Sequence, residues 1–179
     1  MRELYTNRSG KYHLLRLINN IMIKEFEKFH GMVLARMIHD YKKPSIIEPY
    51  PSKDNSSYII NNKIGIYIKY SKKRLSPWRF SFTKEHQDEI QKMKKKLKMV
   101  FVVFVCNDDG IAALSFNELK LVLNEDHKET EWVAIKRRTR EKYSVSGSDG
   151  KLKFKIGECD FPGRLFVESK LSIIKKIFT

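Results

Sequence analysis

The residues between positions 69 and 79 combine dense positive charge with an aromatic ring. Five cations lie in this segment: Lys69, Lys72, Lys73, Arg74 and Arg79. Cations at this density bind phosphate oxygens, and an exposed tryptophan such as Trp78 can stack on a base. The pattern predicts an anionic polymer as the partner. The alternative is that Trp78 and the phenylalanines, Phe80 and Phe82, pack a strand against the core, with Arg79 pointing outward.

A second cationic cluster has the sequence KRRTREK at 136–142. Its candidate phosphate-binding residues are Lys136, Arg137, Arg138 and Arg140. The cluster joins two predicted strands, so it either grips a nucleic-acid backbone or forms a solvated turn.

The net charge is concentrated in two blocks. The chain has 36 basic and 21 acidic residues, a formal charge of +15. Residues 69–99 carry +8 and residues 136–155 carry +6, whereas residues 100–135 carry −5. Such blocks favour a surface that follows phosphates over scattered lysines, although a codon bias toward lysine is an alternative explanation.

The first cationic segment lies inside a predicted crossover unit. IGIYIKYS at 64–71 predicts a strand, KEHQDEIQKMKKKL at 84–97 a helix, and KMVFVVFVC at 98–106 a strand that is apolar on both faces. This order indicates two parallel strands, with a cationic and aromatic loop between the first strand and the helix. Lys69 would then lie near the carboxyl end of its strand, where open α/β sheets bind ligands.

The rest of the chain predicts a mixture of helices and strands. In chain order the further elements are an amphipathic helix at 11–40, an edge strand at 45–48, a hairpin turning at 61–63, a strand at 111–114, a helix at 116–123 capped by Ser115 and Glu118, strands at 131–138, 141–147 and 151–157, and a helix at 169–178. We expect a single domain over 1–179, with a core at about 11–123 and a basic hairpin region with the last helix at about 131–179.

The order helix, strand, hairpin, helix, buried parallel strand and helix resembles the core of the PD-(D/E)XK nuclease superfamily, over residues 11–123. The resemblance implies an α/β (α+β) restriction-endonuclease-like core, a mixed central sheet flanked by helices. It also implies Mg²⁺-dependent hydrolysis of DNA, in DNA processing or genome defence. In such proteins carboxylates hold the magnesium ion, and a lysine orients the nucleophile or stabilises charge.

The resemblance also implies roles for individual residues. Lys69 takes the lysine position, Asp54 the first acidic position, Gln87 the glutamine of the following helix, and Glu25 or Glu27 the first-helix glutamate. The implied catalytic set is therefore Lys69, Asp54, Glu25 and Gln87, with Asp54 and Glu25 as magnesium ligands.

The sequence departs from the superfamily pattern two residues before the lysine, where Tyr67 replaces the acid. A phenol is not a ligand for a hard cation at neutral pH. Glu85 or Glu48 could supply a migrated carboxylate, and His86 could act as an acid or base.

Each of these residues also has a structural interpretation. Lys69 could extend from a strand end into water, and Asp54 could serve a turn. Glu25 could face solvent, and Gln87 and His86 could belong to a polar helix face.

Three functions remain open from the residues alone. The first is a DNA-binding protein with a nuclease-like core, either a Mg²⁺-dependent endonuclease or a catalytically silent subunit without the metal. The second is a non-enzymatic nucleic-acid-binding adaptor, and the third a module that binds an acidic protein. DNA is the expected partner and RNA the alternative, with a homodimer or a partner subunit as the assembly.

The sequence also predicts a location. The first residues lack the apolar segment of a signal peptide, and no apolar run approaches the roughly 20 residues that span a bilayer. Cys106 and Cys159 lie far apart and form no metal-binding motif. We expect a soluble cytoplasmic protein with no membrane partner.

Overall fold

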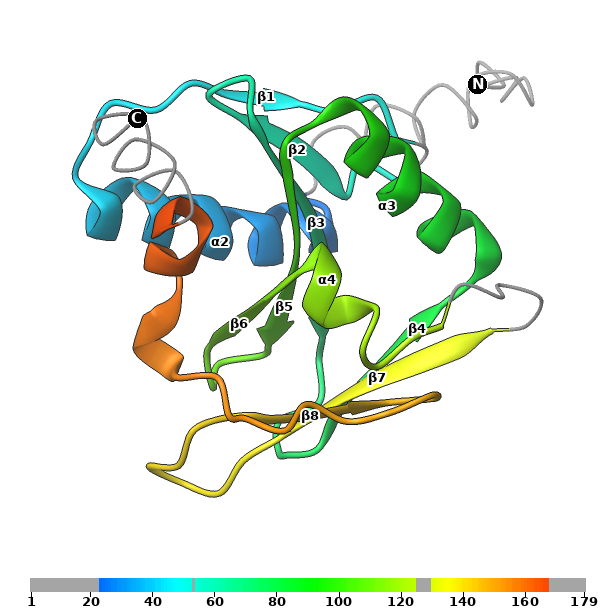
Figure 1. Cartoon of the computed structure of the whole chain (residues 1–179). Coiled ribbons are helices and arrows are strands. Elements are labelled where there is room, and N and C mark those ends of the chain that lie inside the picture. The colour runs from blue at the N-terminus through cyan, green and yellow to red at the C-terminus, as the bar shows by residue number, and fades with distance from the viewer. Residues whose placement is uncertain (1–22, 53, 125–129, 168–179) are drawn as a thin grey trace, which may run out of the picture.

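The computed structural model describes residues 23–52, 54–124 and 130–167, which form three layers (Figure 1). A five-stranded sheet is the middle layer. Helix α2 (Glu25–Tyr41) covers one face, and helix α3 (Lys84–Lys96) and a three-stranded sheet cover the other. Helix α2 is the described part of the helix predicted at 11–40, and the helix predicted at 169–178 lies outside the described residues.

The five-stranded sheet has the order β1-β2-β3-β5-β6. Its strands are β1 (Ile47–Pro49), β2 (Ser57–Ile60), β3 (Ile64–Ser71), β5 (Met99–Cys106) and β6 (Ile111–Ser115). Strands β3 and β5 are parallel, with Lys69 opposite Phe104, and the other pairs are antiparallel. The predicted α/β class, with a mixed sheet flanked by helices, is confirmed.

Strand β5 shows why the predicted buried strand is apolar throughout. Val102 and Phe104 point into the core beneath α3 and the second sheet, whereas Phe101 and Val103 point into the core beneath α2. Both faces of a central strand are covered, so neither face keeps polar residues.

The second sheet has the order β4-β7-β8. It is formed by β4 (Trp78–Phe82), β7 (Glu131–Lys136) and β8 (Ser144–Gly147). Residues 78–82 of the predicted cationic and aromatic loop form β4, in which buried and exposed residues alternate. The alternative of a strand packed against the core is therefore the one that holds here. The strand pairs with β7, about 50 residues away in the chain. The predicted core region at about 11–123 and the predicted basic hairpin region at about 131–179 therefore both contribute strands to the same sheet.

Two further elements differ from the prediction in length. Ser115 caps helix α4 (Phe116–Leu119) as predicted, with its Oγ accepting from the Glu118 amide at 3.3 Å. The helix ends after four residues, and in the turn that follows the carbonyl of Val122 accepts from the backbone amide of Asp149 at 3.1 Å. The strand predicted at 151–157 pairs with 143–146 only at two isolated bridges. Within the described ranges, no helix has the length and apolar character needed to cross a membrane.

Candidate functional site

Four side chains from separate elements meet on the face of β3 that is covered by α3. Tyr67 and Lys69 lie on this face because side chains alternate along a strand. The hydroxyl of Tyr67 donates to Asp54 Oδ2 at 3.0 Å, and Lys69 Nζ lies 3.0 Å from Nδ1 of His86. His86 Nε2 is 3.9 Å from Asp54 Oδ2, which closes the group. We call Asp54, Tyr67, Lys69 and His86 the Asp54 cluster.

The hydrogen bonds of His86 fix the position of its proton. The backbone amide of Thr83 donates to Nδ1 at 3.1 Å, and the Lys69 ammonium donates to the same atom. Nδ1 is therefore an acceptor, and the ring proton lies on Nε2, which faces Asp54. Burial and the nearby charge of Lys69 lower the pKa of His86, so the ring is neutral at pH 7.

Lys69 is the most perturbed cation of the cluster. Its ammonium lies over the rings of Phe82 and Tyr67, at 5.2 and 5.8 Å from their centroids. Burial lowers the pKa of Lys69 to about 8, although the charges of Asp54 and Glu89 oppose the change. The amine is thus mainly charged at pH 7, yet it can lose its proton within one unit above that pH.

Asp54 supplies the negative charge of the cluster. Burial acts to raise the pKa of this carboxyl, but hydrogen bonds from Ser56 and Tyr67 lower it overall. Burial and Asp54 together raise the pKa of Tyr67, so the phenol keeps its proton and acts as a donor. Asp54 is 39% exposed and can therefore reach a substrate.

A cavity of about 630 Å³ lies beside the cluster, between the loop before β2 and helix α3. Asp54 and His86 line it. Its other charged lining residues are Glu85, Asp88, Glu89, Lys92 and Lys96. Lys69 does not line the cavity, but its ammonium lies next to His86, which does. A carboxylate and a neutral imidazole at a cavity, with an ammonium beside them, can bind a phosphoryl group, orient a water molecule and move a proton.

The structure does not bring Glu25 or Gln87 to the cluster. Glu25 lies beyond the opposite face of β3, where it pairs with Lys72 at 3.2 Å and accepts from Tyr70 at 3.5 Å. Gln87 is buried and donates to Glu131. The expectation that Asp54 and Glu25 share a metal site is therefore not met. Among the described residues, no three His, Cys, Asp or Glu side chains converge on a common point.

The comparison with the superfamily pattern does not reveal the role of Tyr67. That pattern marks position 67 only as the loss of a carboxylate, whereas the Tyr67 hydroxyl holds Asp54 in place. The period-two pattern of β3 places positions 67 and 69 on one face, which was the available signal.

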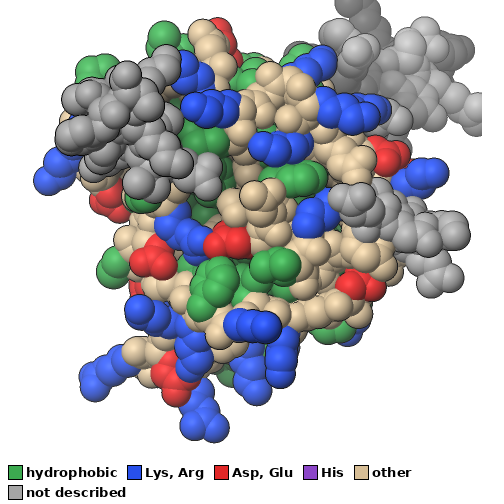
Figure 2. Space-filling model, viewed as in Figure 1, with side chains coloured by type: hydrophobic (Ala, Val, Ile, Leu, Met, Phe, Trp, Pro, Cys, Tyr) green, Lys and Arg blue, Asp and Glu red, His purple; other side chains and the backbone are tan. Residues whose placement is uncertain are grey.

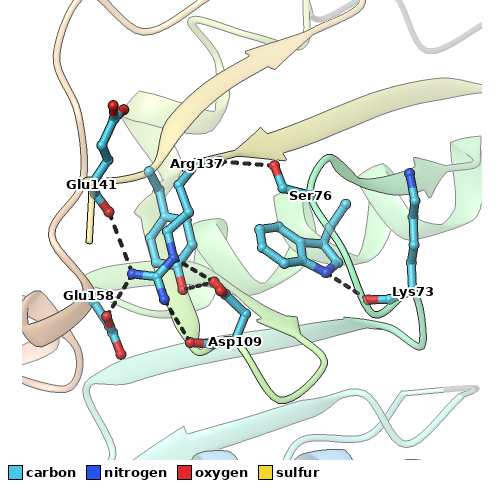
Figure 3. Close-up of polar contacts among 8 residues, drawn as sticks. Lys73, Ser76, Asp109, Arg137, Glu141 and Glu158 are labelled. Atoms are coloured by element: carbon cyan, nitrogen blue, oxygen red, sulfur yellow. Dashed lines mark hydrogen bonds and ion pairs between the residues drawn. The ribbon is translucent and has the colours of Figure 1, made fainter. Parts of the chain in front are cut away.

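Trp78 belongs to the core. Its side chain is 1% exposed, and its indole nitrogen donates to the carbonyl of Lys73 at 2.8 Å (Figure 3). The packing alternative therefore holds for Trp78, and its ring is not available to a base. Arg79 points outward as that alternative predicts, with its guanidinium 4.3 Å from the ring centroid of Trp132.

Arg137 has a structural position within the second cationic cluster. Its guanidinium is 10% exposed and donates to the carboxylates of Asp109 and Glu158, each at 2.6 Å (Figure 3). It also lies 4.7 Å from the ring centroid of Tyr143. Burial opposes the charge, but the two carboxylates raise the pKa of Arg137 overall. The expectation that Arg137 contacts phosphate is therefore not met.

The remaining cations of the two segments lie at one end of the molecule. The pairing of β4 with β7 puts the two loops side by side, and Ser76 Oγ accepts from the backbone amide of Arg137 at 3.1 Å. We call the exposed cations here the cationic end: Lys73, Arg74, Lys136, Arg138 and Arg140. Lys and Arg side chains gather at the lower end of the molecule in Figure 2, where β7 ends and β8 begins.

Comparison of the chain with protein-family models, with curated proteins and with solved structures found no match. The function is therefore inferred below from the Asp54 cluster, its cavity and the cationic end.

Proposed function

We propose that this protein binds nucleic acid and that the Asp54 cluster hydrolyses a phosphodiester bond. DNA is the expected substrate, in DNA processing or genome defence, and RNA is the alternative. The observation that carries the proposal is the meeting of Asp54, Lys69 and His86, although 32 positions separate the first from the last. Asp54 and His86 also line the cavity beside the cluster. The resemblance to PD-(D/E)XK nucleases supports the same reaction, and a cytoplasmic location belongs to the proposal.

Each member of the cluster has a role in this reaction. The Lys69 ammonium binds a non-bridging phosphate oxygen and stabilises its growing negative charge. The Asp54 carboxylate, held by Tyr67, orients the attacking water, and the neutral His86 exchanges a proton at its Nε2 face.

A magnesium ion fits this donor set in part. Magnesium proteins often use one or two carboxylates together with substrate phosphates and waters, and Asp54 supplies one such carboxylate. When bound, the ion would polarise the phosphate and lower the pKa of a coordinated water. Asp54 is the residue that would hold it.

Cleavage of a labelled duplex tests the proposal directly, in magnesium and in chelator. We expect Asp54→Asn and Lys69→Met each to slow cleavage by about 100-fold or more. Asp108→Asn and Lys63→Met are the matched controls, because both residues are exposed and lie outside the cluster. Equal cleavage by all four variants and the wild type would remove the Asp54 cluster from the reaction.

One observation favours a second function, a non-catalytic nucleic-acid-binding subunit. Tyr67 stands at the position where the resemblance calls for a second carboxylate, and its hydroxyl donates a hydrogen bond to Oδ2 of Asp54. A protein of this kind would bind nucleic acid without turnover, and its Asp54→Asn and Lys69→Met variants would bind as well as the wild type.

A further inference from the structure

The outward positions of the second sheet form an exposed, cationic surface. Residues of β4, β7 and β8 that face away from the core are exposed or half-buried, because burial alternates along each strand. We call them the outer sheet face: Arg79, Ser81, Trp132, Ala134, Lys136, Ser144 and Ser146. Two of the seven are cations and none is acidic. Lys151, which pairs with Ser146 at an isolated bridge, adds a third exposed cation at the edge.

The strand register places the ring of Trp132 between residues with small side chains. Trp132 is half-buried and lies opposite Ser81 in β4, and Ala134 follows two residues along its own strand. The Arg79 guanidinium lies over the indole at 4.3 Å from its centroid. Small side chains around a stacked guanidinium and indole leave room for a further flat group on the same surface.

The outer sheet face is continuous with the cationic end. Lys136 belongs to both, and the strand from Trp132 to Lys136 spans about 13 Å at the usual rise per residue. In RNA-recognition domains, the exposed face of a four-stranded sheet stacks two or three bases on its aromatic residues. The charge of the face complements a polyanion, and the planar guanidinium and indole of Arg79 and Trp132 complement an unpaired base.

We propose that the outer sheet face binds a single strand of nucleic acid, with a base stacked on the Arg79–Trp132 pair and phosphates held by Lys136 and Lys151. The inference rests on the proposed function and deepens it, because it identifies the form of nucleic acid that the sheet holds. A duplex buries the faces of its bases, so it can use the cations of this surface but not the stacking pair.

The sharpest test replaces the planar guanidinium of Arg79 by an ammonium, which is not planar. Arg79→Lys keeps the charge and removes the planar guanidinium, so it separates stacking from charge. We expect it to weaken binding of a labelled 12-nucleotide single strand by about 5-fold or more, and to leave binding of a duplex unchanged. Arg36→Lys, on a half-buried residue of helix α2 that lies outside the second sheet and the cationic end, is the control and should change neither.

A second test places a negative charge on the outer sheet face and compares it with the same charge placed elsewhere. Ser81→Glu introduces a carboxylate opposite Trp132, and Ser45→Glu introduces the same charge at an exposed site outside the second sheet. Ser81→Glu should weaken single-strand binding by about 10-fold or more, and Ser45→Glu by much less, with thermal unfolding confirming that both variants fold. Single-stranded DNA and RNA probes of one base composition show which sugar the face accepts.

The outcomes separate this inference from the proposed function. If Arg79→Lys and Ser81→Glu bind single strands as the wild type does, while Asp54→Asn still abolishes cleavage, the sheet face is refuted and the hydrolytic proposal stands. If wild type binds single strands through Arg79 but never cleaves, the sheet face stands and hydrolysis fails. Binding to an acidic protein but to no nucleic acid would overturn both.

Discussion

The partly buried position of Lys69 lowers the stability of the folded protein, which is typical of a functional residue. Its ammonium is partly desolvated between two aromatic rings, and its pKa falls from 10.5 to about 8. The folded protein therefore holds a charge in an unfavourable place at neutral pH. Perturbed groups of this kind are frequent at reactive sites, where function offsets the lost stability.

The Lys69→Met variant should be more stable than the wild type at pH 7. One pKa unit corresponds to about 1.4 kcal/mol, so we expect a gain of about 1–3 kcal/mol in the free energy of unfolding. Between pH 8 and 10.5 the unfolded chain binds the lysine proton and the folded chain does not. Wild-type stability therefore rises with pH over this window, and the advantage of the variant shrinks. Urea unfolding of both proteins at pH 7 and pH 10 measures the difference, and a constant difference would contradict the lowered pKa.

Arg137 and Arg138 are neighbours with opposite expected effects. Arg137→Ala leaves Asp109 and Glu158 without their shared cation and should lower the free energy of unfolding by about 3–5 kcal/mol. Arg138→Ala removes an exposed side chain and should change it by less than about 0.5 kcal/mol. Urea unfolding of the two variants checks this, and equal stability would mean that the Arg137 network contributes little.

At the scale of elements, the second sheet is locked to the turn after α4. Gly147 of β8 lies against the backbone of Val122, whose carbonyl would meet any added Cβ. Gly65 of β3 lies instead against the side-chain ends of Met93 on α3 and of Leu97, the residue that follows α3. The first contact is rigid because it is backbone, whereas the second can adjust by rotating side chains.

Alanine at these two glycines should therefore give unequal losses. We expect Gly147→Ala to lower the free energy of unfolding by about 3 kcal/mol or more, because Val122 cannot yield without moving the turn. Gly65→Ala should cost about half as much or less. Chemical unfolding of both variants gives the comparison, and a larger loss at Gly65 would show that α3, not the turn, is the rigid neighbour.

At the scale of the whole molecule, the two cationic segments lie side by side. They are about 60 residues apart in the chain, and the β4–β7 pairing joins them. Arg137 and Lys72 are paired with carboxylates, whereas Arg138 and Arg140 are exposed cations of the cationic end. Binding of nucleic acid should therefore depend on the position of each cation and not on the total charge of +15.

The salt dependence of duplex binding tests this dependence on position. Replacing Arg138 and Arg140 together by alanine should reduce the slope of log K against log salt by about 1.8, since each lost phosphate contact removes about 0.9. Replacing Lys63 and Lys98, exposed residues beside the starts of β3 and β5, removes the same charge and should leave the slope nearly unchanged. Equal slopes for the two double variants would indicate non-specific attraction to the whole protein.

The sequence alone determined the features that local pattern encodes. The uniformly apolar residues of β5 identified a central strand parallel to β3, and Ser115 with Glu118 identified a helix start, because burial on both faces and capping depend on near neighbours. The charge blocks were equally visible. Lys69, Asp54 and His86 were also identified as candidates, since the order of elements brings the loop before β2, the end of β3 and the start of α3 together.

Only the tertiary structure decided which side chains lie on which face of each sheet and which lie in the core. It separated Glu25 from Asp54 by the thickness of the sheet, turned Trp78 inward, and enclosed Arg137 between two carboxylates. It also paired β4 with β7, which created the outer sheet face. Pairing between strands 50 residues apart depends on how whole layers pack, and a one-residue change in register would reverse every side chain, so no local pattern fixes it.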